Sequence, residues 1–443
     1  MVHVFPYWDF NEGQLIDVCV CSNAPSVELF ANGISQGRRE IDHKHGKELV
    51  AKWQLPYKRG ELRAVAYDEN GNIIAEDIQK SFSDAARIAL TPDKTELLAD
   101  GQDMIFIEIS MTDKDGNPVH NANNRVHVNV TGAARLVGLD NGDSTDFESY
   151  KGTSKRLFGG KLLAMLAAKT NPGDIKVEVT SEGLPAAVLN LVAKESPVRE
   201  GISAREENAK SENNPEIPIR KLEIISKQGT LQDENLTEVM LELKVYPENA
   251  TYKDISWRVT NAAGVDSGIA QIVEAGPGHA KIKAFGDGIF YVRAMANNGR
   301  DHTNIISMLD FKVSGMGKAF LNPYKFISGS LYSRSIGEVG NGFERGVSAA
   351  RDGETIIIFD NIYFGDYGSD TITMPLFCFG SEPVPIQIWE GVPGKEESYL
   401  VADVIYQKKE NLYAYQEVTF RLNKRLKGVT TISFLLRNNV HIK

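Results

Sequence analysis

The amino-acid sequence predicts an all-β protein made of four consecutive β-sandwich modules. Short runs in which apolar and polar residues alternate recur along all 443 residues, for example at 61–67 and 105–110, and this period of two is typical of half-buried strands. Turn signals such as Asn32-Gly33 and Asp115-Gly116 lie between the runs. No helical spacing of apolar residues continues beyond about ten residues. Closely spaced strands with such turns indicate sandwiches of about 100 residues each.

The overall charge limits the classes of partner. The chain has 49 Lys and Arg against 59 Asp and Glu, which gives a net charge of −10. Because a nucleic-acid-binding surface requires clustered basic residues, we expect no nucleic-acid partner. No apolar run reaches the roughly 18 residues of a membrane span, so we expect no membrane partner. The three cysteines are expected to be buried thiols.

Three changes in composition divide the chain. One strand run ends and another begins near residues 81–86. Residues 196–216 hold five Glu and no aromatic residue, a composition too polar to bury a core, which predicts an acidic linker. Ser314-Gly315-Met316-Gly317 is a small-residue hinge. The expected modules are residues 1–84, 85–195, 217–314 and 315–443.

The first two modules carry ordered motifs. Residues 1–84 contain Trp8-Asp9-Phe10, then 27–33 (VELFANG), Trp53-Gln54-Leu55-Pro56-Tyr57 and 60–67 (GELRAVAY). This series resembles the Ig-like domain that follows the catalytic barrel in bacterial family 2 glycoside hydrolases of the β-galactosidase type. Residues 85–195, with 113–118 (DKDGNP) and 138–143 (GLDNGD), resemble the next Ig-like domain of the same enzymes.

The last two modules resemble other domain families. Residues 217–314, with 255–259 (ISWRV), resemble a bacterial Ig-like spacer domain, in which Trp257 is the expected core tryptophan. Residues 315–443, with 341–347 (NGFERGV), 361–368 (NIYFGDYG) and 386–391 (IQIWEG), resemble a family 6 carbohydrate-binding module. That second resemblance implies a jelly-roll sandwich.

It also implies a sugar-binding site, since the family binds sugars with two stacked aromatic rings and an asparagine near the last strand. Aligned on residues 415–419, the platform tryptophan of the family falls on Leu412, which has no flat ring, and Tyr413 is the expected substitute. Tyr332 is the expected second ring, and Asn438 and Asn439 are the expected polar partners. Glu344 and Arg345 are expected to contact the sugar hydroxyl groups. The alternative is that Tyr332 and Tyr413 pack loops and that the module is a spacer.

No cofactor is expected. The Asp, Asn and Gly residues of 113–118 and 138–143 offer the oxygen ligands that Ca²⁺ prefers, but Asx-turns explain the same pattern. The structural calcium implied by the family 6 resemblance lacks matching ligands, because the chain has His441-Ile442-Lys443 where an Asp is expected. His43-Lys44-His45 has no further His or Cys at a zinc-binding spacing.

Catalysis is not expected of this chain alone. Family 2 enzymes are retaining glycosidases that use two carboxylates, placed at strand ends of a TIM barrel. The chain shows no alternation of strand and helix patterns. Asn11-Glu12 matches the acid/base dipeptide of the family, but it precedes Gly13 in an expected turn.

The sequence therefore predicts a non-catalytic accessory region of a bacterial β-galactosidase-like glycoside hydrolase. Its expected partners are its own catalytic domain and an oligosaccharide or polysaccharide bound by the last module. The alternative is a cell-surface adhesion or structural protein of Ig-like repeats without sugar binding, and the motif series of residues 1–84 favours the glycosidase. The compartment stays open between the cytoplasm and secretion.

Overall fold

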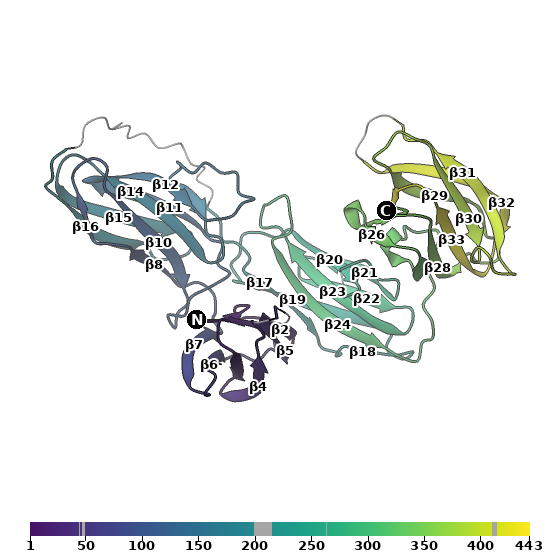
Figure 1. Ribbon diagram of the computed structural model, residues 1–443, viewed down its shortest axis with the longest axis horizontal. Coiled ribbons are helices and arrows are strands. Elements are labelled where there is room, and N and C mark those ends of the chain that lie inside the picture. Colours follow the sequence, from purple (N-terminus) through teal and green to yellow (C-terminus); the bar gives the residue numbers. More distant parts are fainter. Residues whose placement is uncertain (44, 47–48, 199–214, 263, 410–413) are drawn as a thin grey trace. The chain divides into compact units, whose positions relative to one another are not determined.

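The computed structural model describes residues 1–443 except 44, 47–48, 199–214, 263 and 410–413 (Figure 1). The described residues form β-strands, turns and two short 3-10 segments, and contain no α-helix, which confirms the predicted all-β class. Contacts divide the chain into two compact units. The first comprises residues 1–223, 245–254 and 296–305, and the second comprises 224–244, 255–295 and 306–443. The predicted division into four modules stays a prediction.

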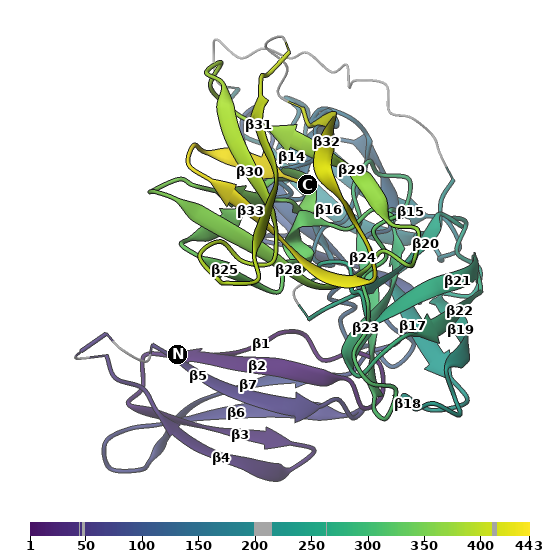
Figure 2. The same cartoon turned by 90° about the vertical axis from the view of Figure 1, so that its right-hand side faces the viewer.

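The first unit begins with two facing sheets (Figure 2). One sheet has the order β1-β2-β5, with bounds Val2–Phe5, Leu15–Ser22 and Val50–Pro56. The other has the order β4-β3-β6-β7, with bounds Ile34–Glu40, Ser26–Ala31, Glu61–Tyr67 and Ile73–Lys80. The Asn32-Gly33 pair joins β3 to β4 with φ angles of 49° and 78°, the left-handed backbone that a two-residue hairpin requires.

The core between these sheets contains the aromatic residues of the first motif series. Trp8 is 2% exposed, and its indole N–H donates to the Lys58 carbonyl at 3.0 Å. Its ring centroid lies 5.0 Å from that of Tyr57, which is also buried.

The three cysteines differ in burial. Cys19 and Cys21 are only half-buried on β2, whereas Cys378 is buried as expected, and all three are free thiols.

A second pair of sheets follows in the same unit. One has the order β12-β14-β10-β8, with bounds Ala134–Asp140, Lys161–Ala168, Met104–Thr112 and Arg87–Pro92. The other has the order β13-β11-β15-β16-β9, with bounds Ser154–Arg156, Arg125–Gly132, Gly173–Ser181, Ala187–Lys194 and Glu96–Leu98. Alternate residues of β10, Ile105, Ile107 and Ile109, are fully buried, as the period of two predicts.

The Asp- and Asn-rich segments of this region form turns. Oδ1 of Asp113 accepts the backbone N–H groups of Asp115 and Asn117 at 3.0 and 2.8 Å, and its Oδ2 accepts that of Ser83 at 3.0 Å. Asn141 accepts the N–H of Asp143 in the same way at 3.0 Å. These are the Asx-turns that such residues favour. In the part of the chain that the structure describes, no group of three or more His, Cys, Asp or Glu has an arrangement that could hold a metal.

The buried carboxylate of Glu216 bonds this residue to the second pair of sheets. Glu216 is 5% exposed. Arg156 donates two hydrogen bonds to it, both at 2.6 Å, Arg125 donates one at 3.0 Å, and the Tyr252 hydroxyl donates another. Arg125 also pairs with Glu148 at 2.6 Å. The predicted linker of residues 196–216 therefore ends in a fixed residue, and its residues 199–214 lie outside the described part.

Residues 221–313 form two four-stranded sheets, in the orders β17-β19-β22-β21 and β18-β24-β23-β20. The bounds in these orders are Lys221–Ser226, Glu238–Tyr246, His279–Ala284 and Ala270–Gly276, then Leu231–Gln232, Ile305–Val313, Gly288–Ala296 and Ile255–Thr260. Trp257 is only half-buried on β20, so its prediction as the core tryptophan is wrong. Phe290 and Phe311 fill the core instead, with centroids 5.2 Å apart.

Residues 334–442 form two five-stranded sheets, in the orders β25-β28-β33-β30-β31 and β26-β27-β34-β29-β32. The bounds of the first are Arg334–Ile336, Thr355–Tyr363, Val429–Leu436, Val384–Glu390 and Tyr399–Tyr406. Those of the second are Val339–Asn341, Val347–Ala349, Val440–Ile442, Ser369–Phe377 and Gln416–Leu426. One apolar core, which includes Ile357, Leu376 and Leu436, lies between them.

The Glu216 network predicts a large effect on stability. Glu216→Ala leaves Arg156 buried without its carboxylate and removes one of the two carboxylates that bond Arg125, which costs about 3–5 kcal/mol. The matched control is Glu108→Ala, because Glu108 pairs with Lys161 at the surface, where an ion pair contributes about 0.2–1 kcal/mol. Urea unfolding followed by circular dichroism measures both. Equal losses of unfolding free energy in the two variants contradict the prediction.

The same carboxylate makes stability depend on pH. Burial raises the pKa of Glu216, but hydrogen bonds from Arg156 and Tyr252 and the charges of Arg156 and Arg125 lower it by more, to below its ordinary 4.5. Such a group contributes stability that is present above the unfolded-state pKa and is lost as the pH falls through the folded-state pKa. We expect the Tm of the wild type to fall more steeply than that of Glu216→Gln below about pH 4.5. If the Tm values of the wild type and of Glu216→Gln fall equally with pH, the prediction is wrong.

Candidate functional site

Five aromatic side chains meet at one end of the last pair of sheets. They come from the 3-10 segment η2 (Phe343–Arg345), from the end of β29 and the segment directly after it, from the residue before β32, and from β34. Strand pairing brings them together, because β34 pairs with β27, which follows η2, and with β29, where Phe377 lies opposite His441. We call this cluster the aromatic end, and its members are Phe343, Phe377, Phe379, Tyr415 and His441.

The rings of the aromatic end form a buried layer and an exposed layer. Phe377 and His441 are 2% and 6% exposed, whereas Phe343 and Phe379 are 54% and 55% exposed. Phe343 stacks on His441 with centroids 5.4 Å apart and planes at 14°. Phe343 and Phe379 stand nearly edge to face, 5.9 Å apart at 68°. Two apolar rings are thus presented to solvent on a support of packed rings.

Tyr415 fixes the backbone that carries Phe343. Its hydroxyl donates to the Phe343 carbonyl at 2.9 Å. Burial, followed by the charge of Glu344, raises the pKa of Tyr415 to about 12, so the phenol stays protonated and available as a donor. A Cβ on Gly346 would lie 2.5 Å from the Tyr415 hydroxyl oxygen and 2.5 Å from the Ile442 carbonyl oxygen. Glycine at 346 therefore permits the close packing of this end.

Charged groups also lie at the aromatic end. Glu344 forms an ion pair with Lys443, and its backbone is left-handed, with φ of 49°. Lys408 places its amine 5.4 Å from the centroid of the Phe377 ring. A carboxylate and two amines thus lie at the same end of the sheets as the two exposed rings, an arrangement that suits a ligand with apolar faces and a polar rim.

The structure brings together only part of the predicted site. Glu344 is exposed at the aromatic end. Asn439 is half-buried, and its side-chain amide donates to the Ser348 hydroxyl at 3.1 Å and the Ala349 carbonyl at 2.9 Å, which makes it a bridge between β34 and β27. Asn438 is exposed.

The remaining predictions have different outcomes. Tyr332 is half-buried against the apolar core of the last sheets, so its ring has a packing role in this structure. Tyr413 and Leu412, together with the side chain of Arg345, lie outside the described residues.

Sequence reasoning missed Phe343 and Phe379. Each is a phenylalanine next to a glycine in a turn, at Gly342-Phe343 and Phe379-Gly380. A large apolar residue in a turn has no strand face to bury it, and this was the available signal. Their proximity to His441, near the end of the chain, depends on strand pairing and is not visible in the local sequence.

Earlier catalytic and metal candidates have ordinary structural surroundings. Glu12 is exposed in a turn between β1 and β2. His43 bonds the Ala24 carbonyl at 3.2 Å, and His45 bonds the Asp42 carboxylate at 2.9 Å. Within the described residues, no helix has the length and apolar character needed to cross a membrane.

Comparison with known proteins places the first half of the chain. Residues 88–190 match the family described as glycoside hydrolase family 2 C-terminal domain 5, and residues 13–75 match a domain of unknown function, DUF4982. A stretch of 198 residues is 37% identical to the β-galactosidase BoGH2A of Bacteroides ovatus. The chain contains a non-catalytic region of glycoside hydrolase family 2.

Other known proteins are also similar to parts of this chain. A putative β-glucuronidase of Formosa agariphila is 32% identical over 189 residues. A β-glycosidase structure from Bacteroides vulgatus covers 43% of this chain and 24% of its own, with 31% identity and a TM-score of 0.41. The matches to the two sequence relatives cover 44% and 40% of this chain, and only 23% and 17% of the relatives themselves.

The stacked pair of the aromatic end gives a spectroscopic prediction. Burial, followed by the charge of Arg351, lowers the pKa of His441 below 6.5. Phe343→Ala removes the ring that covers the imidazole, so we expect its pKa to rise towards 6.5 in an NMR titration. The control is Tyr399→Ala, because Tyr399 is an exposed aromatic residue at the start of β31. This variant should leave the titration of His441 unchanged. An unaltered His441 curve in Phe343→Ala contradicts the stacking.

Proposed function

We propose that the chain is the accessory part of a family 2 glycoside hydrolase of the β-galactosidase or β-glucuronidase type, and that its C-terminal module binds carbohydrate. The identity to the Bacteroides ovatus β-galactosidase supports the first part. In this proposal the partner of the first two modules is the catalytic domain of the same protein, which supplies the two carboxylates of a retaining glycosidase. The chain itself performs no chemistry.

The aromatic end carries the second part of the proposal. Pyranose rings have apolar C–H faces that pack on aromatic rings, and hydroxyl groups at their edges that hydrogen-bond to polar side chains. Phe343 and Phe379 offer the exposed rings, and Glu344 and Lys443 offer an acceptor and a donor beside them. The two facing five-stranded sheets suit the proposed jelly roll.

The rigid support of the rings favours binding over simple surface exposure. The Phe343 ring stacks on the buried His441 ring, and the Phe343 carbonyl accepts a hydrogen bond from the Tyr415 hydroxyl. A ring that is already fixed loses little conformational entropy when a ligand packs on it. Exposed phenylalanines on a mobile loop would lack this advantage.

Calorimetric titration of the chain against neutral and acidic oligosaccharides tests the proposal. We expect saturable binding that weakens about fivefold in Phe343→Ala and in Phe379→Ala, because a ring contact of this kind contributes on the order of 1 kcal/mol. Tyr399→Ala, an exposed aromatic of the same sheets, should bind as the wild type does. The Tyr413→Ala variant tests the ring that the family resemblance implies.

The outcomes separate the alternatives. Loss of affinity in the two phenylalanine variants, with Tyr399→Ala unchanged, supports a sugar site at the aromatic end. An absence of binding across the panel defeats the sugar-binding proposal and leaves a spacer or an adhesion module. Equal weakening in all three variants points to a general effect on folding and also counts against the site.

A further inference from the structure

The last pair of sheets also presents aromatic side chains at the end opposite the aromatic end. Strand β29 reaches the aromatic end at Phe377 and begins at Ser369, which pairs with Leu426 at the end of β32. Near this start of β29, Tyr324 and Tyr367 are 61% and 80% exposed. Large exposed rings that gather in one place mark a binding surface more often than rings that are scattered singly.

The two tyrosine rings line one open hollow of about 640 Å³. Sites for small molecules have a similar size, about 300–1,000 Å³. Residues 364–370 supply most of the lining, among them Asp366 and Asp370, and Tyr324 and Arg425 supply the rest. We call this site the tyrosine hollow.

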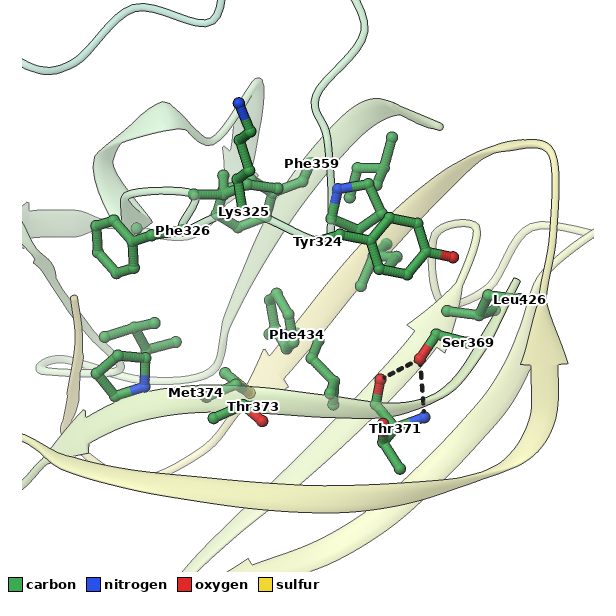
Figure 3. A pocket seen from close by; sticks show the side chains of 18 of the residues that line it. Tyr324, Lys325, Phe326, Phe359, Ser369, Thr371, Thr373, Met374, Leu426 and Phe434 are labelled. Carbon is green, nitrogen blue, oxygen red and sulfur yellow. Dashed lines mark hydrogen bonds between the residues drawn. The ribbon is translucent and has the colours of Figure 1, made fainter. Parts of the chain in front are cut away.

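Tyr324 is fixed at three points. Its backbone N–H donates to the side-chain oxygen of Asn322 at 2.9 Å, and its hydroxyl donates to the Phe364 carbonyl at 2.8 Å. Its ring stands edge to face with that of Phe364, with centroids 6.4 Å apart at 82°. In Figure 3 the Tyr324 ring lies across the adjoining cavity from Ser369. A ring that is held in this way loses little conformational entropy when a ligand packs on it.

Arg425 fixes the other tyrosine of the hollow. Its guanidinium carbon lies 4.5 Å from the centroid of the Tyr367 ring, where the cation is attracted by the aromatic face. The same guanidinium forms an ion pair with Asp370 at 3.2 Å. The Tyr367 ring is therefore held in place although most of it is exposed to solvent.

The turn after β28 is locked to the turn between β32 and β33. The backbone N–H of Phe364 donates to the Gly428 carbonyl at 2.7 Å, and that of Gly428 donates to the Gly365 carbonyl at 2.8 Å. Gly368 has a φ of 77°, and a Cβ there would lie 2.0 Å from the Leu426 carbonyl oxygen. Only glycine fits this position, so the turn that forms the hollow has a fixed shape before any ligand binds.

The charges of the hollow favour hydroxyl groups over an anion. Its lining contains the carboxylates of Asp366 and Asp370 and the guanidinium of Arg425. Asp370 is paired with Arg425, whereas Asp366 is exposed. An ionised carboxylate only accepts hydrogen bonds. Sugar hydroxyl groups donate such bonds, but the carboxylate of an acidic sugar would be repelled.

We propose that the tyrosine hollow is a second carbohydrate-binding site and that it takes a neutral pyranose unit. The sugar packs its apolar C–H groups against Tyr324 and Tyr367 and donates hydroxyl hydrogen bonds to Asp366. The site is separate from the aromatic end, because its lining comes from the other end of β29. A module with two such sites holds two sugar units at once, which strengthens its attachment to a polysaccharide through avidity.

Fluorine NMR of the chain labelled with fluorotyrosine tests this site. The labelled chain carries Phe343→Ala and Phe379→Ala, so that the rings of the aromatic end take no part. Tyr324→Phe and Tyr367→Phe assign the two resonances of the hollow. The methyl glycosides of galactose, glucose and xylose are the probes. We expect both resonances to move along one saturable binding curve with at least one of these neutral glycosides.

A matched pair of substitutions locates the binding. Tyr367→Ala should weaken it at least about fivefold, as measured at the Tyr324 resonance, because one ring contact is lost. The control is Tyr399→Ala, since Tyr399 is also exposed and has the Lys424 amine 5.4 Å from its ring centroid, but lies outside the hollow. This variant should bind as its parent does. Equal Tm values of the two variants show that both remain folded.

Three results overturn the proposal. The first is that neither tyrosine resonance moves with any of the neutral glycosides. The second is that Tyr399→Ala weakens binding as much as Tyr367→Ala does. The third is that methyl glucuronide binds as tightly as the neutral glycosides. Because the exposed rings of the aromatic end are removed in every sample, none of these results depends on whether that end binds sugar.

Discussion

Burial of one face of the central strands is the constraint on which the sheets of the described residues depend. On β10 the residues Ile105, Ile107 and Ile109 are fully buried, while Phe106 between them is partly exposed. Each buried aliphatic side chain contributes about 1.5–3 kcal/mol, and a slip of one residue would turn all of them outward at once. This cost fixes the register, and the register in turn decides which distant residues become neighbours.

Buried ion pairs specify an orientation between segments, which apolar burial alone does not specify. In the first unit, Arg220 bonds Asp9 at 2.5 Å and Asp84 at 2.7 Å, and Arg156 holds Glu216 through two bonds. Burying such pairs is costly, so they contribute little net stability compared with apolar packing. Their geometry is specific, however, because a guanidinium matches a carboxylate in only a few orientations. They therefore define how residues 216–220 attach to the first two pairs of sheets.

The parts of the structure that the sequence predicts are those set by local pattern. The alternation of apolar and polar residues predicted the strands, Asn32-Gly33 predicted a hairpin, and the Asp113 segment fitted an Asx-turn. Half-burial of Trp257 and burial of Glu216 could not be predicted in this way, because both depend on contacts with distant residues. The aromatic end has the same origin, since Phe343 and His441 meet only through the pairing of β27 with β34.

The aromatic end depends on one short strand. The three residues of β34 place His441 opposite Phe377 and against the Phe343 ring, and the backbone N–H of Lys443, the next residue, donates to the Pro375 carbonyl at 3.1 Å. A three-residue strand is held by few backbone bonds, so its position depends strongly on what packs around it. The rigidity of the exposed Phe343 ring therefore depends on the packing around β34.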